Sequence, residues 1–348
     1  MFKRFTFILC FLCACAGFCG GASAKSFAEV NAAARAAFEA EHIDGMGLAI
    51  YNREGVKVFE KMYGDFEPNR RVPIASASKL VSGVTIFRLI DQGRISLSTT
   101  TGESLGWTGD SGAITLRHLL SFTSGLRPEC RCTFQPRLKL ADCVQQIAGA
   151  GLVAPPGTLF QYGSTHLEVA GRMAEVATGK SWNRIFAEQI LGPLGLPSDM
   201  TYYANPLRPA ATANPLLAGG LFASMNEYAR VLYLVFDKGR WRGRQLISAA
   251  LFDEQTQAPY PDAATGKTPW PGHRYGLTAW LECNEPAKGC ASISSPGAFG
   301  FTPWIDREAG YYAILGMDYR RNPRTQFGAR TEQALKPLIA KSMKESFR

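Results

Sequence analysis

Strand-like patterns lie near both ends of this 348-residue chain and enclose a long helical middle. Near the N-terminus, two short segments rich in apolar and β-branched residues flank a turn at Arg53–Gly55 and predict a hairpin of Gly47–Asn52 with Val56–Tyr63. Strand patterns return towards the C-terminus at Tyr275–Leu281, Phe299–Ile305 and Tyr311–Met317. These distant segments form one sheet only if the two ends of the chain pair with each other. The sequence therefore predicts an α+β fold with one antiparallel sheet, flanking helices and an inserted all-helical lobe.

Helical spacing of apolar residues marks the segments around the predicted strands. Helices are expected around Phe27–Glu41, from Ser78 to a glycine stop at Gly93, and from about Thr331. Capped helices alternate with loops rich in glycine and proline in the middle of the chain. The expected division is a sheet lobe of about residues 25–95 and 239–348, with a helical lobe of about residues 96–238.

The N-terminus is typical of an export signal. A charged start at Met1–Arg4 precedes an apolar run, Phe5–Phe18, and a small-residue site at Ala22–Ala24. This pattern predicts a signal peptide over residues 1–24 and a periplasmic or secreted domain over residues 25–348. The segment Leu12–Cys15 also resembles a lipoprotein cleavage site, which would make Cys15 a lipid anchor. The apolar run is short for a transmembrane helix, and no later window is long and apolar enough, so no transmembrane segment is expected.

Charge and residue composition argue against several classes of function. The chain carries 38 basic and 29 acidic residues. Its basic residues are scattered and do not alternate with aromatic residues, which argues against a nucleic-acid partner. The domain after residue 24 contains no Cys-x-x-Cys and no His-Glu-x-x-His pattern, and the chain has four histidines. We therefore expect neither a metal site nor a cofactor.

Five cysteines lie after the predicted signal peptide, an arrangement that suits an oxidising compartment. Cys283 and Cys290 bracket a short polar loop and are expected to form a disulfide. Cys143 can pair with either Cys130 or Cys132. One thiol then stays free.

Ser76 and Lys79 are candidates for nucleophilic chemistry. Positions three apart share one face of a helix, so the hydroxyl and the amine lie within reach of a hydrogen bond. The helix N-terminus adds N–H groups and a positive dipole end, and burial would lower the pKa of the lysine enough for it to act as a base. A Ser-x-x-Lys match alone carries little weight, because about one is expected by chance in a chain of this length.

Other candidate nucleophiles and bases fit less well. Gly102–Gly106 matches the Gly-x-Ser-x-Gly pattern, but Ser104 has loop-like sequence on both sides and not the strand and helix that a nucleophile elbow needs. His118 and His166 open or occupy predicted helices, and we expect structural roles for both.

Other segments of the sequence strengthen the prediction that Ser76 and Lys79 are catalytic. Four segments occur in order: Pro73–Lys79, Ile114–Leu126, Pro156–Ser164 and Gly219–Arg230. Together they resemble the serine β-lactamase-like superfamily, in the branch that holds class C β-lactamases, D-alanyl-D-alanine carboxypeptidases, lactamase-fold esterases and aminohexanoate-oligomer hydrolases. The resemblance extends over nearly the whole chain after the signal peptide. It implies a β-lactamase/transpeptidase-like fold.

The resemblance also implies roles for single residues. Ser76 would be the nucleophile, Lys79 its proton acceptor or relay, and Tyr162 a phenolate-like partner that passes a proton to the leaving group. We expect the pKa of Tyr162 to be lowered, because a buried tyrosine between two cations would favour its ionised form. The remaining expected substrate and oxyanion residues are Ser164, Ser295, Gly297 and Ala298, with the backbone N–H groups of Ser76 and Ala298 forming the oxyanion hole.

Two positions depart from the family pattern. Ser295 stands where members that bind a substrate carboxylate usually carry a cation, and Ser164 replaces the more frequent asparagine. Loss of a charge-assisted contact at Ser295 would cost a carboxylate substrate about 1.5–3 kcal/mol. The sequence thus predicts a serine hydrolase that acts on an ester or amide of a small molecule or peptide. A β-lactamase and a non-catalytic protein that binds penicillin or cell-wall fragments are the alternatives.

Overall fold

The computed structural model describes residues 27–319 and 325–346 of the chain. The predicted signal peptide and Cys15 lie outside these residues. No helix in the described part is both long and apolar enough to cross a membrane.

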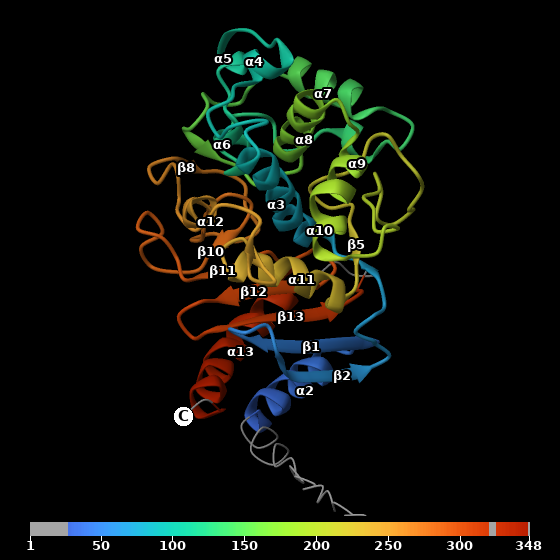
Figure 1. The fold of residues 1–348 in the computed structure, drawn as a ribbon, viewed down its shortest axis with the longest axis vertical. Helices are drawn as coiled ribbons and strands as arrows, with labels where there is room; N and C mark the ends of the chain where they lie inside the picture. The colour runs from blue at the N-terminus through green and yellow to red at the C-terminus, as the bar shows by residue number, and fades with distance from the viewer. Residues whose placement is uncertain (1–26, 320–324, 347–348) are drawn as a thin grey trace, which may run out of the picture.

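The fold is built on a seven-stranded antiparallel sheet with the strand order β2-β1-β13-β12-β11-β10-β9. Its second and third strands join the two ends of the chain, because β1 pairs with β13 from Met46 opposite Met317 to Asn52 opposite Tyr311. The α+β prediction is therefore confirmed (Figure 1). The strands of this sheet are β1 (Gly45–Asn52), β2 (Lys57–Gly64), β9 (Arg274–Tyr275), β10 (Trp280–Leu281), β11 (Ser292–Ser294), β12 (Thr302–Asp306) and β13 (Tyr311–Met317).

Side chains on a strand alternate between the two faces of the sheet, and nearly all those of β1, β12 and β13 are buried, so both faces are covered at these strands. On one face, Leu48 and Ile50 pack with α2 (Ala28–Glu41) and α13 (Thr325–Ser346). These two helices lie side by side below the sheet in Figure 1, and Lys341 of α13 binds Glu29 of α2 at 2.8 Å. The expected N-terminal helix is confirmed, whereas α13 begins six residues before the expected Thr331.

Helix α11 (Met225–Phe236) covers the opposite face of the sheet. Gly47 and Gly316 lie opposite each other on β1 and β13, and a Cβ on either would come within 2.7 Å of the Met225 side chain. The paired glycines therefore let α11 approach the sheet closely. By sequence, α11 falls within the stretch assigned to the helical lobe, but it packs on the sheet because these small residues leave room for it.

The helical lobe lies above this layer in Figure 1. Helix α3 (Ser78–Asp91) runs from the lobe to the sheet and is buried on nearly all sides, as expected for a helix that is apolar around its circumference. The other helices of this region are α4 (Thr101–Leu105), α5 (Gly109–Gly112), α6 (Leu116–Leu120), α7 (Leu140–Gly149), α8 (Thr165–Thr178), α9 (Trp182–Phe186), the π-helix η3 (Ala187–Leu191) and α10 (Gly192–Leu194).

Shorter elements complete the described part of the chain. They are the 3-10 helices η1 (Ala75–Ala77) and η2 (Arg131–Phe134), the helix α12 (Ala249–Gln255), and the paired strands β3 (Val72–Pro73) with β5 (Phe222–Ala223), β4 (Leu159–Phe160) with β8 (Ala264–Thr265), and β6 (Arg240–Trp241) with β7 (Arg244–Gln245).

Two disulfides stabilise the loops of the domain. Cys283 pairs with Cys290 as predicted, and Cys143 pairs with Cys132. The choice between the two candidate partners follows from burial, since Cys132 is fully buried against α7 while Cys130 is half-buried and free.

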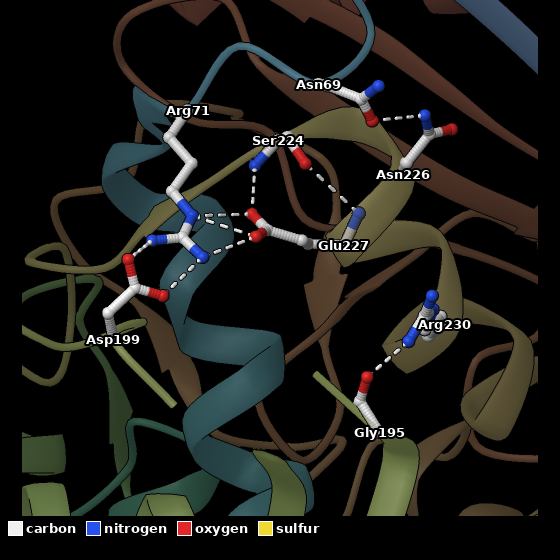
Figure 2. Close-up of polar contacts among 8 residues, drawn as sticks. All are labelled: Asn69, Arg71, Gly195, Asp199, Ser224, Asn226, Glu227 and Arg230. Carbon is white, nitrogen blue, oxygen red and sulfur yellow. Dashed lines mark hydrogen bonds and ion pairs between the residues drawn. The ribbon is translucent and has the colours of Figure 1, made fainter. Parts of the chain in front are cut away.

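A polar network holds the segment that leads into Ser76 (Figure 2). Arg71 binds both oxygens of Glu227 at 2.8 and 3.0 Å and also binds Asp199. Glu227 in turn accepts the backbone N–H of Ser224 at 2.9 Å, closing a capping box at the start of α11. A second bond joins Asn226 to Asn69 at 2.7 Å. The network ties the strand before the candidate nucleophile to the helix on the sheet.

We expect Arg71→Ala to lower the free energy of unfolding by about 1–3 kcal/mol, because the carboxylates of Glu227 and Asp199 both lose the guanidinium group that binds them. Urea titration of the purified domain measures the loss. Arg70→Ala is the matched control, because the ion pair of Arg70 is with the exposed Asp65 and its loss should cost less than about 1 kcal/mol. Equal losses in the two variants would contradict this role for Arg71.

Candidate active site

Ser76 lies in the 3-10 turn η1, directly before α3. The turn is anchored by Ile74, whose backbone N–H donates to the carbonyl of Leu221 at 3.1 Å. Ala75 adopts a φ of 46°, in the left-handed region that costs energy for a residue with a side chain. Both neighbours of Ser76 are buried, whereas Ser76 itself is half-buried. The strained turn thus presents one hydroxyl at the surface of a closely packed segment.

Lys79 is buried beside Ser76, as its position one helical turn later predicts. Its Nζ atom donates to Ser76 Oγ at 3.0 Å and to the carbonyl of Ala218 at 2.8 Å. Only 3% of the residue is exposed. Burial lowers the pKa of Lys79 to about 8, although the nearby carboxylates of Glu129 and Glu168 oppose this shift. Lys79 therefore exchanges its proton close to neutral pH.

Tyr162 completes the group of three expected catalytic side chains. Lys79 Nζ lies 4.7 Å from the centre of the Tyr162 ring, which stacks on Trp280 with the ring centres 5.0 Å apart. Burial raises the pKa of Tyr162 well above its usual value, and hydrogen bonding to Ser76 offsets only part of the rise. The expected lowered pKa is therefore wrong. The ring packs against aromatic side chains, and the single ammonium beside it is itself readily neutralised.

The Ser295–Ala298 segment follows the end of β11 and contacts the turn that carries Ser76. Ser295 Oγ donates to the carbonyl of Ser76 at 3.3 Å, and its backbone N–H donates to Pro303 of β12 at 3.1 Å. A Cβ on Gly297 would lie 2.1 Å from the carbonyl oxygen of Ile74, so only glycine permits this approach. Ala298 follows as a half-buried residue. Ser295 and Gly297 thus contact the turn that carries Ser76, and Ala298 follows Gly297 in the chain.

Ser164 leads to a residue that the sequence analysis missed. Its hydroxyl donates to Glu129 Oε2 at 2.6 Å, across a separation of 35 positions in the chain. Ser164 is buried, whereas Glu129 is exposed. No sequence signal singles out Glu129, because a glutamate in a loop is usually a solvated surface residue.

A second missed carboxyl lies behind Lys79. Glu168 of α8 is fully buried and accepts the backbone N–H groups of Leu217 at 2.9 Å and Ala218 at 3.4 Å. Burial raises its pKa well above the usual value, which favours a neutral carboxyl. Glu168 therefore positions the loop whose carbonyl binds Lys79. The available signal was a charged residue on the apolar face of a predicted helix.

The remaining candidates have structural partners and form no hydrogen bond with Ser76 or Lys79. Both ring nitrogens of His166 are engaged, with Ser124 at 2.8 Å and the carbonyl of Gln161 at 2.9 Å, and burial lowers its pKa to about 4. His118 binds the backbone of Thr115 and packs on Tyr260. Ser104 lies on the short helix α4, which is capped by Thr100, so the prediction of a loop at this position is wrong. No strand precedes this helix directly, so Ser104 does not lie on a strand-to-helix elbow.

The described residues contain no group of three or more histidine, cysteine or acidic side chains arranged to hold a metal ion. The groups gathered here are a hydroxyl, an amine that titrates near neutral pH, a neutral phenol and backbone amides. This set is suited to acyl transfer.

Comparison with known proteins agrees with this geometry. A Bacteroides dorei protein described as a candidate β-lactamase is 27% identical, with a TM-score of 0.78, and the match covers 90% of this chain and 98% of that one. The hydrolase EstCE1, described as having promiscuous acyltransferase activity, shares the fold at 19% identity and a TM-score of 0.72, over 92% of this chain and 98% of its own.

Among curated relatives, Penicillin-binding protein 4 of Amycolatopsis lactamdurans is 28% identical over 59% of this chain. Protein flp of Staphylococcus aureus (strain MW2) is 25% identical over 44% of it. The matches span 62% and 34% of these relatives, less than two thirds of their length.

The model of the family described as Beta-lactamase matches residues 30–334, which is most of the chain. The resemblance seen in the sequence is thereby confirmed. This chain belongs to the β-lactamase family, whose members are serine hydrolases acting on ester or amide bonds.

Proposed function

We propose that this protein hydrolyses an ester or amide through an acyl-enzyme formed on Ser76. The observation that carries the proposal is the 3.0 Å hydrogen bond between Lys79 Nζ and Ser76 Oγ, in a setting that lowers the pKa of Lys79 to about 8. A nucleophilic serine needs a base within hydrogen-bond reach, and the base works best when its pKa lies near the operating pH.

In the acylation step, neutral Lys79 takes the proton of Ser76 while Oγ attacks the carbonyl carbon of the substrate. The C–O π electrons move onto oxygen, where the backbone N–H groups of Ser76 and Ala298 would stabilise the negative charge. The bond to the leaving group then breaks and a proton is returned to the departing oxygen or nitrogen. Attack by water on the acyl-serine, with the same groups, releases the acid and restores Ser76.

Tyr162 fits this sequence as a neutral relay. Because burial raises its pKa, its hydroxyl keeps its proton near neutral pH and can donate it to the leaving group while receiving another from Lys79. This role replaces the phenolate-like role expected from the resemblance. The base in the proposed mechanism is therefore Lys79 alone.

The substrate is proposed to be an ester or amide of a small molecule or peptide. Ser295 is neutral and already bound to the carbonyl of Ser76, so it offers no cation to the carboxylate of a penicillin. A β-lactamase and a non-catalytic binder of penicillin or cell-wall fragments remain outcomes of the tests below.

We also propose that the protein is exported to the periplasm or secreted, with residues 1–24 as its signal peptide. Two disulfides in the described domain support an oxidising compartment. Lipid attachment at Cys15 is the alternative form of the same proposal.

We expect a fluorophosphonate probe to form one covalent adduct, on Ser76, because Lys79 activates this hydroxyl. Mass spectrometry of the labelled and digested protein locates the adduct. Ser76→Ala should abolish labelling, whereas Ser104→Ala, the matched serine of the Gly-x-Ser-x-Gly pattern, should label as the wild type does. Absence of an adduct on Ser76 would overturn the proposal.

A substrate panel then separates the reactions. Short-chain aryl esters test for an esterase, nitrocefin for a β-lactamase, and D-Ala-D-Ala peptides for a carboxypeptidase. We expect turnover of the esters and at least tenfold weaker kcat/KM for nitrocefin, in line with the missing cation at Ser295. Labelling of Ser76 without turnover of any ester, amide or lactam would favour the binder.

The rate of labelling should depend on pH through Lys79. Because the base must be neutral, the rate should rise about tenfold per pH unit from pH 6 to pH 7.5 and level off above about pH 8. Stopped-time labelling across this range measures the profile. Tyr162→Phe should label more slowly with the same inflection, and Lys79→Arg should label negligibly. An inflection near pH 6 would contradict Lys79 as the base.

A further inference from the structure

We propose that the acyl group of the substrate carries a cationic amine and that Glu129 is the residue that selects it. This inference rests on the proposed function, because it concerns the substrate of the same site. It starts from the 2.6 Å hydrogen bond between Ser164 and Glu129. The proposed catalytic steps do not involve this bond.

Glu129 is held firmly in place beside the catalytic tyrosine. The preceding carbonyl, that of Pro128, accepts the backbone N–H groups of Ser164 at 2.8 Å and Thr165 at 3.2 Å. A Cβ on Gly163 would lie 2.1 Å from the same carbonyl oxygen, so the two loops are in direct backbone contact. The bond from the buried hydroxyl of Ser164 then orients the carboxylate. A charge fixed in this way binds a partner without a further loss of side-chain entropy.

The Glu129 carboxylate faces solvent close to the reacting groups. Ser164, its hydrogen-bond partner, is two residues from Tyr162, and the negative charge of Glu129 raises the pKa of both Lys79 and Tyr162. The residue is exposed, and no lysine or arginine of the described chain forms an ion pair with it. Glu129 is therefore an exposed anionic group beside the site, with no ion-pair partner among the described residues.

Two exposed arginines flank Glu129 in the chain, Arg127, whose Nε donates to the carbonyl of Ala150 at 3.0 Å, and Arg131, and neither forms an ion pair with Glu129. Ser295 is neutral, and Lys79 is buried and occupied by Ser76 and Ala218. Lys267 is an exposed cation whose carbonyl accepts the N–H of Tyr162 at 3.1 Å. Its ammonium is bound to no described residue, so it is not oriented as Glu129 is.

A fixed carboxylate at this place favours an ammonium group on the acyl side and repels a carboxylate. The substrate class is thus an amino-acyl ester or amide, or a peptide with a free amino group a few bonds from the scissile carbonyl. The negative charge of Glu129 and the lack of a cation at Ser295 should both weaken the binding of anionic β-lactams.

Two esters of equal shape test the inference. In p-nitrophenyl butyrate and p-nitrophenyl β-alaninate, a methyl group is replaced by an ammonium group of similar size. The measured quantity is the ratio of their kcat/KM values, cationic over neutral, in each variant. Because the intrinsic reactivities of the esters are the same for every variant, changes in this ratio report the protein alone.

We expect Glu129→Gln to lower the ratio about three- to tenfold, since glutamine still accepts the hydrogen bond from Ser164 but has no charge. Glu129→Lys should lower it further, and added salt should reduce the wild-type ratio but not that of Glu129→Gln. Glu39→Gln is the charge-matched control, because Glu39 is an exposed residue of α2 below the sheet, and its ratio should equal that of the wild type.

The outcomes separate this inference from the proposed function. A ratio that is unchanged in both Glu129 variants, or that rises, overturns the inference while a fluorophosphonate adduct on Ser76 of the wild type still supports the hydrolase. Lys267→Gln is expected to change the kcat/KM ratio less than Glu129→Gln does. If Lys267→Gln raised the ratio by as much as Glu129→Gln lowered it, a charge without a fixed position would have the same effect as Glu129, and the selective role of Glu129 would be overturned. Failure of the wild type to label at Ser76 overturns both.

Discussion

The pairing of β1 with β13 is the contact on which the rest of the structure depends. These strands come from opposite ends of the chain, and their register places the two paired glycines under α11. Once the sheet is closed, β11 and β12 continue from β13, and the segment beginning at Ser295 meets the turn that carries Ser76. Ser76 and Ser295 are more than 200 residues apart in sequence, so only the assembled sheet brings them together.

The site operates through burial as much as through proximity. Removal of Lys79 from water lowers its pKa, while the same environment raises the pKa of Tyr162 and Glu168 and lowers that of His166. Lys79, whose pKa is lowered to about 8 and whose Nζ lies 3.0 Å from Ser76 Oγ, is therefore the candidate proton acceptor of the site. Glu129 differs from these groups because it is exposed, and its charge is therefore available to a substrate.

Local patterns predicted much of the fold and part of the site. The hairpin, the helix after Ser76 and the Cys283–Cys290 disulfide follow from short-range spacing and were confirmed. Two errors arose where competing local signals were overlooked or outweighed. The segment around Ser104 was expected to be a loop, but the capping box at Thr100 stabilises a helix there. Helix α11 was assigned to the helical lobe, but it packs on the sheet, where Gly47 and Gly316 leave room for it.

The sequence by itself determined which residues are available for catalysis, because Ser76 and Lys79 share a helical face whatever surrounds them. Tertiary structure alone decided the pKa shifts of these groups and the placement of a charge beside them. The pKa of Tyr162 depends on how many aromatic rings exclude water from it, and Glu129 became a candidate only through a hydrogen bond to a serine 35 positions away. Both effects depend on distances in space, and these distances are absent from local sequence patterns.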